Sequence, residues 1–219
     1  MTENDVLAAV RAFSQSKMGD DETGHGFDHI QRVVSLTDKL VREYPAANRV
    51  LTVTAAYLHD VIDEKLVDDT AAASAEVRDF LTQQGFSAAD SDTVFLIMDN
   101  MSYHKTIDGT AKPLPLEGQI VQDADRLDAI GAIGISRAIY FGGHFGEKIY
   151  DPAVNPRTSM THAEYRNLDN ETIINHFYEK LLKLKDLMNT DAAKRVAEHR
   201  QQVMLDFLAE YKAEWNAQA

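Results

Sequence analysis

The sequence predicts an all-α protein, and three observations support that prediction. Apolar residues recur at helical spacing along almost the whole chain of 219 residues, no segment shows a convincing strand pattern, and Gly or Pro follows several of the periodic segments. Neither an internal repeat nor a low-complexity tract is evident. The length suits one globular domain. We therefore expect a single helical domain over residues 1–219, with a core at about 20–140 and a loop and two further helices at about 143–219.

The first two predicted helices differ in how much of their surface is apolar. One carries an apolar stripe on a single face, from Ile30 to Tyr44, and Pro45 closes it. The next, over residues 50–62, is apolar on nearly all sides. A helix without a polar face is expected at the centre of a domain.

Two more helices are predicted before the middle of the chain. An apolar group at residues 77–81 is followed by Gly85, which marks a stop. Ser87 then precedes Asp90 by three residues, a capping-box pattern. This pattern predicts the start of a helix with the sequence DTVFLIMDNM.

The second half of the chain contains a long helix, an irregular stretch and two amphipathic helices. The long helix is expected at about 117–140, broken near Gly131 or Gly134, and ended by Gly142 and Gly143. The irregular stretch, residues 143–167, has a length typical of functional loops or insertions. The last two helices carry apolar stripes at Ile174, Phe177, Leu181, Leu184 and Met188, and at Val196, Val203, Phe207, Tyr211 and Trp215.

Composition narrows the class of function. The formal net charge of -13 argues against a general nucleic-acid binder, because such proteins need basic surface. Cysteine is absent, so a metal would have to be held by His and carboxylates. No window is long and apolar enough to span a bilayer, and the segment MTENDVLAAVRAF lacks the pattern of a signal peptide. We expect a cytoplasmic protein without a polynucleotide or membrane partner.

His59 and Asp60 form a polar doublet at the end of the most hydrophobic segment, within YLHDVIDEK. If the helix continues through them, Asp63 lies four residues after His59 and three after Asp60. All three side chains can then point into the same cavity. Burying an ionised Asp beside a His is costly unless a metal or hydrogen bonds compensate. Taken alone, the doublet is explained better by a helix cap or a hydrogen-bonded polar patch than by a metal site.

Two other predicted helices also interrupt their apolar faces with His or Asp. The segment HGFDHIQRV has His25 and His29 four residues apart, and an antiparallel neighbour would bring His29 beside His59. The segment QDADRLDAIGAIG carries Asp123, Asp125 and Asp128. Nitrogen and oxygen ligands without sulfur suit a divalent ion such as Mn²⁺, Mg²⁺, Fe²⁺, Ni²⁺ or Zn²⁺.

The order His29, then His59 and Asp60, then Asp125 resembles the H…HD…D pattern of the HD-domain superfamily of helical, metal-dependent phosphohydrolases. The longer segments HGFDHIQRV, LHDVIDEK, QDADRLDAIGAIGISRA and NHFYEKLLKLKDLMNT are similar to its YpgQ/YedJ-like branch and cover nearly the whole chain. The resemblance implies a single HD-domain helical bundle with two additional C-terminal helices. It also implies that His29, His59, Asp60 and Asp125 hold one divalent metal ion, with Mn²⁺ as the first expectation. Asp128 would then be a carboxylate behind the ligands or a packing group.

The resemblance further suggests residues that act on the substrate. Asp63 follows the doublet where some HD phosphohydrolases have a carboxylate near the water, so we expect general acid/base or water-positioning catalysis from it. A solvated loop carboxylate is the competing interpretation, and Glu64 is the weaker candidate for the role. Lys105, in MSYHK, is expected to bind the phosphate during catalysis.

Other basic residues are candidate substrate contacts because charge-assisted hydrogen bonds suit a phosphate. They are Lys65, His104, Arg126, Arg157 and His176. Several also have a structural explanation: a surface or ion-pair role for Lys65 and Arg126, a helix cap for His104, and packing for His176. Arg32, one turn from His29, could reach the pocket or pair with an acidic neighbour.

The function implied by the resemblance is hydrolysis of a small phosphorylated metabolite. A nucleotide is expected, with a nucleoside or deoxynucleoside triphosphate cleaved to monophosphate and pyrophosphate. No P-loop or G-x-G-x-x-G motif points to a nucleotide independently. Two alternatives stay open: a non-catalytic HD domain that senses a nucleotide or metal, and a di-iron oxygenase-type HD protein that recruits His25 and His104. A homodimer is possible through the last helices.

Overall fold

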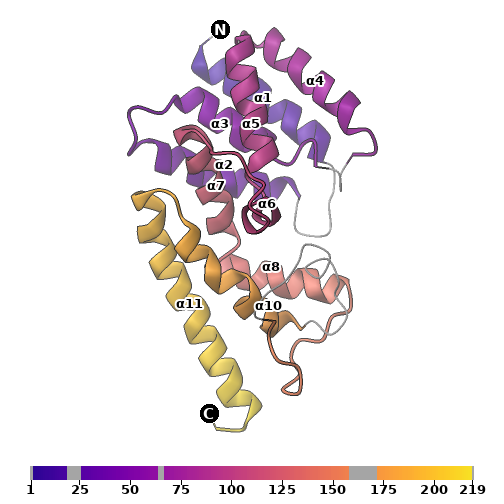
Figure 1. Cartoon of the computed structure of the whole chain (residues 1–219), viewed down its shortest axis with the longest axis vertical. Coiled ribbons are helices and arrows are strands. Elements are labelled where there is room, and N and C mark those ends of the chain that lie inside the picture. The colour runs from indigo at the N-terminus through magenta and orange to yellow at the C-terminus, as the bar shows by residue number, and fades with distance from the viewer. Residues whose placement is uncertain (1, 19–25, 64–66, 158–171, 219) are drawn as a thin grey trace. The chain divides into compact units, whose positions relative to one another are not determined.

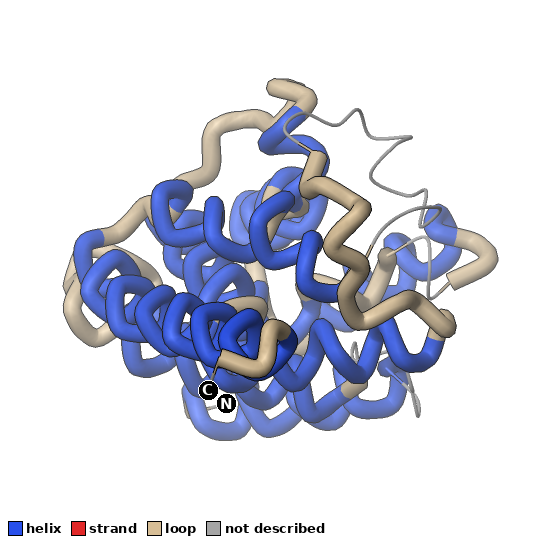
Figure 2. Tube along the Cα trace, turned by 90° about the horizontal axis from the view of Figure 1, so that it is seen from below, coloured by secondary structure: helices blue, strands red, loops and turns tan. Residues whose placement is uncertain are grey.

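The computed structural model describes residues 2–18, 26–63, 67–157 and 172–218. Within these residues the chain is helical, with loops between the helices and a single isolated parallel bridge between Lys148 and Thr172 (Figure 2). The all-α prediction is confirmed. The chain divides into two compact units, Met1–Ala124 and Asp125–Ala219, and the boundary falls inside helix α7 (Leu116–Asp128).

The first unit is built around a central helix. Its helices are α1 (Glu3–Met18), α2 (Phe27–Val41), α3 (Arg49–Leu58), α4 (Thr70–Gln83), α5 (Ala88–Asn100) and α6 (Tyr103–Ile107), followed by the start of α7 (Figure 1). α3 packs against α1, α2 and α5. Seven of its ten residues are buried, in agreement with the apolar sequence.

Two differences from the prediction concern α1 and the end of α3. No helix is predicted specifically for residues 3–18, because their apolar stripe is weak. In the structure, α1 buries only Val10, Ser14 and Met18. α3 ends at Leu58 rather than at residue 62. The backbone then tightens into turns, in which Val61 N–H donates to Leu58 O and Asp63 N–H donates to Asp60 O, both at 3.0 Å.

The caps that separate α4 from α5 follow the sequence signals. Gly85 has a φ of 87°, and the amides of Gly85 and Phe86 donate to the carbonyls of Thr82 and Leu81, which is a Schellman motif. The capping box of α5 is confirmed: the Asp90 amide donates to Ser87 Oγ at 3.1 Å, and the Ser87 amide donates to Asp90 Oδ2 at 3.2 Å.

The described part of the second unit comprises the last residues of α7 and four further elements. These are α8 (Gly131–His144), α10 (Ile173–Glu179), the 3-10 helix η1 (Leu181–Leu187) and α11 (Asp191–Trp215) (Figure 1). The predicted break occurs at Gly131, whose φ is +76°. One predicted helix is instead divided into α10 and η1, because Lys180 adopts a non-helical backbone with φ -133° and ψ -61°.

α11 differs from its prediction in the face that it buries. The buried seam runs through Ala193, Ala197, Met204 and Leu208. The predicted stripe lies beside this seam, and Trp215 at its end is 51% exposed. Alanines form part of this buried seam. A search for stripes of large apolar residues does not identify them as buried.

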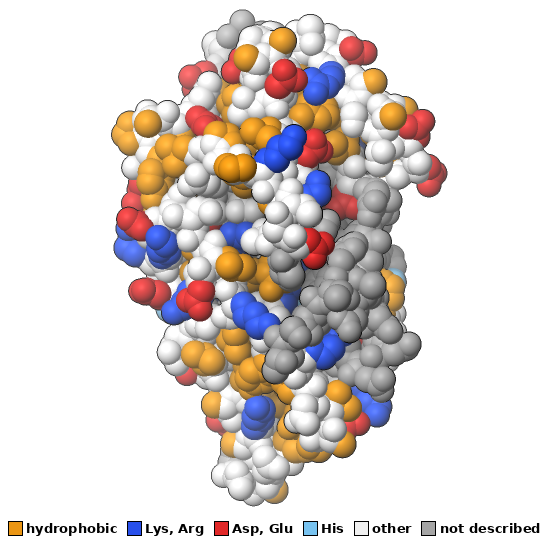
Figure 3. All heavy atoms as spheres, in the orientation of Figure 1, with side chains coloured by type: hydrophobic (Ala, Val, Ile, Leu, Met, Phe, Trp, Pro, Cys, Tyr) orange, Lys and Arg blue, Asp and Glu red, His pale blue; other side chains and the backbone are white. Residues whose placement is uncertain are grey.

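On the face drawn in Figure 3, acidic and basic side chains alternate without a continuous stripe of either sign. No helix among the described residues combines the length and the apolar character that a membrane span would require.

Candidate metal centre

His29 lies in the first turn of α2 and faces the interior. Its side chain is 1% exposed, and α2 buries Ile30, Val33 and Val34 along the same segment. The His29 amide donates to Gly26 O at 2.9 Å, which fixes the start of the helix. A rigid helix start therefore presents a buried imidazole, as a metal ligand requires.

His59 is the C-cap of α3, and a backbone hydrogen bond orients its imidazole ring. Nδ1 lies 2.8 Å from the carbonyl oxygen of Ala56. A carbonyl can only accept, so Nδ1 carries a proton, and in the neutral imidazole Nε2 then presents its lone pair. Hydrogen bonding at one ring nitrogen commonly prepares the other to bind a metal.

Three side-chain atoms converge at this point. His59 Nε2 is 3.3 Å from His29 Nε2 and 3.3 Å from Asp60 Oδ2, and His29 Nε2 is 3.7 Å from the same Asp60 oxygen. An ion about 2.0–2.2 Å from each atom, the usual distance to nitrogen and oxygen ligands, fits between them. The two imidazole rings are inclined by 75°, so both nitrogens can point to one centre.

Asp125 lies in the last turn of α7 and offers a further carboxylate. A carboxylate oxygen of Asp125 and one nitrogen each of His29 and His59 all lie within 4.8 Å of one another. α7 is one continuous helix whose earlier residues belong to the first unit, where Gln122 Nε2 donates to Met101 O at 3.0 Å. Among its neighbours Asp125 is half-buried, whereas Asp123 is fully buried. Imidazole nitrogens and carboxylate oxygens suit a divalent ion.

A surface ion pair flanks His29. Arg32 Nη1 donates to Asp28 Oδ2 at 2.6 Å, four residues apart on α2. Partial burial alone would raise the pKa of Asp28, but the hydrogen bond and charge of Arg32 outweigh it, and the pKa lies below its usual value. Of the two roles considered for Arg32, pairing with an acidic neighbour is the one observed.

The catalytic candidates after the doublet are described only in part. Asp63 follows Asp60 in a tight turn and is half-buried. Glu64 and Lys65 lie outside the described residues, and so does the side chain of His104. Lys105 Nζ donates a hydrogen bond to the carbonyl of Asp99, near the end of α5.

The predicted substrate contacts in the second unit have protein partners. Arg126 is 5% exposed, and its Nη1 donates to Leu187 O. Arg157 donates three hydrogen bonds to the buried carboxylate of Glu179, from its amide, Nε and Nη2, at 2.8, 2.9 and 2.5 Å. His176 is half-buried on α10. Asp128 is 1% exposed and pairs with Arg137 Nη1 at 2.9 Å.

Two contacts around the candidate ligands were missed by the sequence analysis. The Ala56 carbonyl orients His59, and a backbone acceptor leaves no motif in the sequence. Arg200 donates to Leu127 O at the end of α7, 73 residues earlier in the chain. The only available signal for Arg200 was a cationic residue beside an apolar seam, which is common on amphipathic helices.

Comparison with known proteins identifies the family to which this chain belongs. Residues 26–130, which contain all four candidate ligands, match the family model described as HD domain. The chain is 38% identical to YpgQ of Bacillus subtilis over 199 residues, which cover 91% of this chain and 88% of YpgQ. It therefore belongs to the HD-domain family, in the branch of YpgQ, and the resemblance inferred from the sequence is confirmed.

Solved structures agree with this assignment. A Lactobacillus plantarum protein is similar with a TM-score of 0.84 and 50% identity, covering 99% of this chain and 100% of that one. YpgQ in complex with ADP is similar with a TM-score of 0.78 and 36% identity, covering 98% and 97%. An HD-superfamily hydrolase from Bacillus thuringiensis is similar with a TM-score of 0.76 and 37% identity, covering 99% and 100%. Family and donor cluster together support a metal-dependent hydrolase.

Proposed function

We propose that this protein is a metal-dependent phosphohydrolase of small phosphorylated metabolites. The expected substrate is a nucleoside or deoxynucleoside triphosphate, released as monophosphate and pyrophosphate. One observation carries the proposal: two imidazole nitrogens and a carboxylate oxygen, of His29, His59 and Asp60, converge within 3.3–3.7 Å, with Asp125 nearby. The complex of YpgQ with ADP supports a nucleotide as the substrate class.

The roles of the residues follow from their chemistry. A divalent ion bound by these ligands, with Mn²⁺ as the first expectation, would lower the pKa of coordinated water and polarise a phosphoryl oxygen. His59, whose Nδ1–H donates to Ala56 O, keeps its Nε2 lone pair directed at the centre. Asp63, joined to Asp60 by a tight turn, is proposed to accept the proton of the attacking water. Glu64 is the alternative base.

The proposed reaction cleaves the bond between the α-phosphorus and the oxygen that bridges it to the β-phosphorus. The oxygen of one water forms a bond to the α-phosphorus, the bond from that phosphorus to the bridging oxygen breaks, and pyrophosphate leaves with the electron pair. Lys105 is proposed to bind the phosphates, which would require its ammonium to exchange its bond to Asp99 O for a phosphate oxygen. Lys65, His104, Arg126, Arg157 and His176 are proposed as further substrate contacts.

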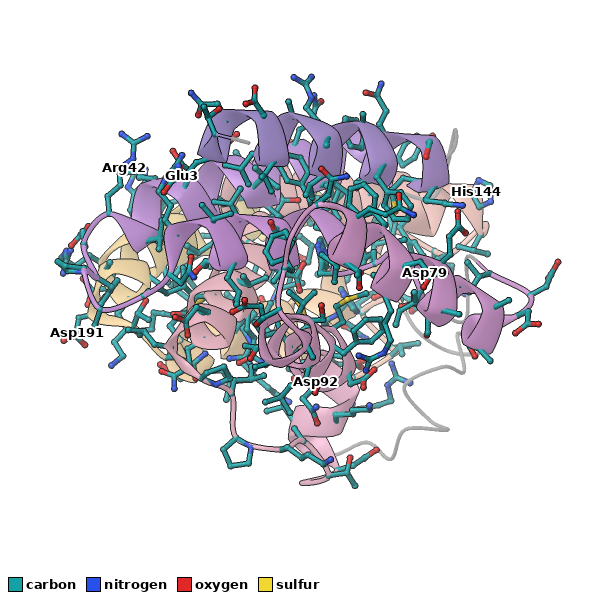
Figure 4. The ribbon with its side chains drawn as sticks, turned by 90° about the horizontal axis from the view of Figure 1, so that it is seen from above. Glu3, Arg42, Asp79, Asp92, His144 and Asp191 are labelled. Atoms are coloured by element: carbon teal, nitrogen blue, oxygen red, sulfur yellow. The ribbon has the colours of Figure 1, made fainter. Side chains whose placement is uncertain are left out.

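A product assay tests the proposal. Orthophosphate and pyrophosphate would be measured from a panel of ribo- and deoxynucleotides and common phosphomonoesters, with Mn²⁺, Mg²⁺, Ni²⁺ or no added metal. We expect metal-dependent pyrophosphate from triphosphates, and its loss in His59→Ala but not in His144→Ala, whose histidine is exposed at the end of α8 (Figure 4).

Each other result selects a different function. Orthophosphate from monoesters would keep the site and change the substrate. Nucleotide or metal binding without turnover would favour a sensor, and iron-dependent oxygen consumption would favour an oxygenase. Equal turnover in His59→Ala and the wild type would overturn the assignment of the centre.

A further inference from the structure

The last turn of α7 carries Asp125 and ends abruptly. The amides of Ala129 and Ile130 donate to the carbonyls of Arg126 and Leu127, both at 3.2 Å. The final carbonyls of a helix lack partners within the helix and must find others. How this turn is held therefore affects the direction of the Asp125 side chain.

Arg200 of α11 supplies an additional donor to this turn. Its Nη1 donates to Leu127 O, which already accepts from the Ile130 amide. A cation at the C-terminus of a helix also interacts favourably with the helix dipole. Arg200 thus acts on the helix end from an element 73 residues away in sequence.

The stem of Arg200 is held as closely as its guanidinium. A Cβ built on Gly131 would lie 2.9 Å from Arg200 Cγ and 3.0 Å from Arg200 Cβ. Burial lowers the pKa of Arg200, and the charge of Asp128 partly opposes that shift. Arg200 is half-buried, and its guanidinium is held by the carbonyl of Leu127.

A second hydrogen bond also holds the end of α7. Arg126 Nη1 donates to Leu187 O of η1, so the residue directly after Asp125 is also anchored. Both contacts use backbone carbonyls as acceptors, so they locate the helix end without depending on a particular partner side chain.

We propose that Arg200 is a positioning residue for the metal centre: by capping the last turn of α7 it fixes the direction in which Asp125 presents its carboxylate. The inference rests on the proposed function, because it takes Asp125 as a ligand. Removing groups that orient metal ligands typically weakens metal binding about 10–100-fold. A similar loss is expected here, while the remaining ligands keep measurable affinity.

The test compares Mn²⁺ affinity, measured by electron paramagnetic resonance, in four variants of the full chain. Arg200→Ala is expected to bind about tenfold or more weakly, and Arg200→Lys, which can still donate to a carbonyl, should recover part of the loss. Lys194→Ala removes a 50% exposed cation from the same helix and should bind as the wild type does. Met204→Ala deletes a fully buried side chain of α11 and reports the effect of lower stability alone.

Hydrogen exchange of the metal-free protein gives a second readout. Arg200→Ala should speed exchange at the amides of Ala129 and Ile130, but Met204→Ala should not do so selectively. Wild-type Mn²⁺ affinity in Arg200→Ala, or an equal loss in Met204→Ala, would overturn the inference while leaving the proposed function intact. No Mn²⁺ binding by the wild type would instead overturn both.

Discussion

At the scale of single residues, buried charge is stabilised by close partners. Glu179 is 2% exposed, and its carboxylate accepts all three hydrogen bonds that Arg157 donates to it. These bonds connect Arg157 to α10. A further contact to α10 lies nearby in the chain, because Asn175 Nδ2 donates to Val154 O at 3.0 Å.

Replacing Arg157 should therefore destabilise the protein. Arg157→Ala leaves the buried carboxylate of Glu179 without its cation, and breaking such a pair typically costs about 3–5 kcal/mol. Urea denaturation should report a loss of that order, reduced in the double variant Arg157→Ala/Glu179→Gln. A loss in Arg157→Ala smaller than in Lys148→Ala, which removes a 72% exposed cation, would contradict this account.

Asp38 gives a residue-scale prediction about pH. Partial burial would raise the pKa of Asp38, but hydrogen bonds from Arg42 and Arg49 outweigh it and lower the pKa below its usual value. Arg42 lies on the outside at the end of α2 (Figure 4), and Arg49 Nη2 is 2.5 Å from Asp38 Oδ1. Because the folded-state pKa is lowered, the stabilisation is present above pH ~4 and is lost as the pH falls through the folded pKa.

Asp38→Asn should lower the free energy of unfolding by about 1 kcal/mol at pH 7, since the network is partly exposed. The gap to the wild type should narrow as the pH falls below about 4. Asp79→Asn, an exposed residue of α4 (Figure 4), is the control. A gap that stays constant from pH 7 to pH 3 would refute the assigned role of the carboxylate.

At the scale of elements, helix ends decide where the functional side chains lie. α3 stops just before His59, and α7 stops just after Asp125, so both ligands occupy last turns or caps. The turn from α7 into α8 requires Gly131, because its φ is +76° and a Cβ would meet the stem of Arg200. Backbone geometry and tertiary contact therefore both exclude a side chain at this position.

A pair of glycine variants separates these two causes. Gly109 has a similar φ of +65°, but a Cβ there would meet nothing within 4 Å. Gly109→Ala should cost about 1–2 kcal/mol from backbone strain alone. Gly131→Ala should cost about 1–3 kcal/mol more, from overpacking against Arg200. If both variants lose the same free energy of unfolding, measured by heat or urea, then the Arg200 side chain moves aside without an energetic cost.

The elements also show what the sequence could and could not predict. Apolar periodicity located the principal helices, and capping signals located Gly85 and the start of α5, because these features are local. The break at Lys180 was not visible, since residues 174–188 keep a helical apolar pattern across it. The pairing of Arg157 with Glu179 and the cap from Arg200 join residues far apart in sequence. Only the fold brings them together.

At the scale of the whole molecule, the candidate ligands come from three helices and one turn. The resemblance named His29, His59, Asp60 and Asp125, and family membership is confirmed. The structure brings both imidazoles and the Asp60 carboxylate to within 3.3–3.7 Å of one another. The tautomer that directs the His59 lone pair inward depends on a backbone carbonyl, which the sequence did not reveal.

Metal binding should therefore stabilise the folded chain. A ligand that binds only the native state raises the free energy of unfolding by about 2.7 kcal/mol at 100 times its dissociation constant. Thermal unfolding with and without Mn²⁺, in wild type and in His59→Ala, measures this linkage. A chelator should reverse the shift in the wild type and leave His59→Ala unchanged.

The most direct test of the metal centre is a Mn²⁺ titration of the chelator-treated protein, followed by electron paramagnetic resonance. We predict one tight site per chain in the wild type and in His144→Ala, and its loss in His59→Ala and in Asp60→Asn, all with unchanged helical circular dichroism. Tight binding that persists in both ligand variants would contradict the assignment of the metal to His29, His59, Asp60 and Asp125.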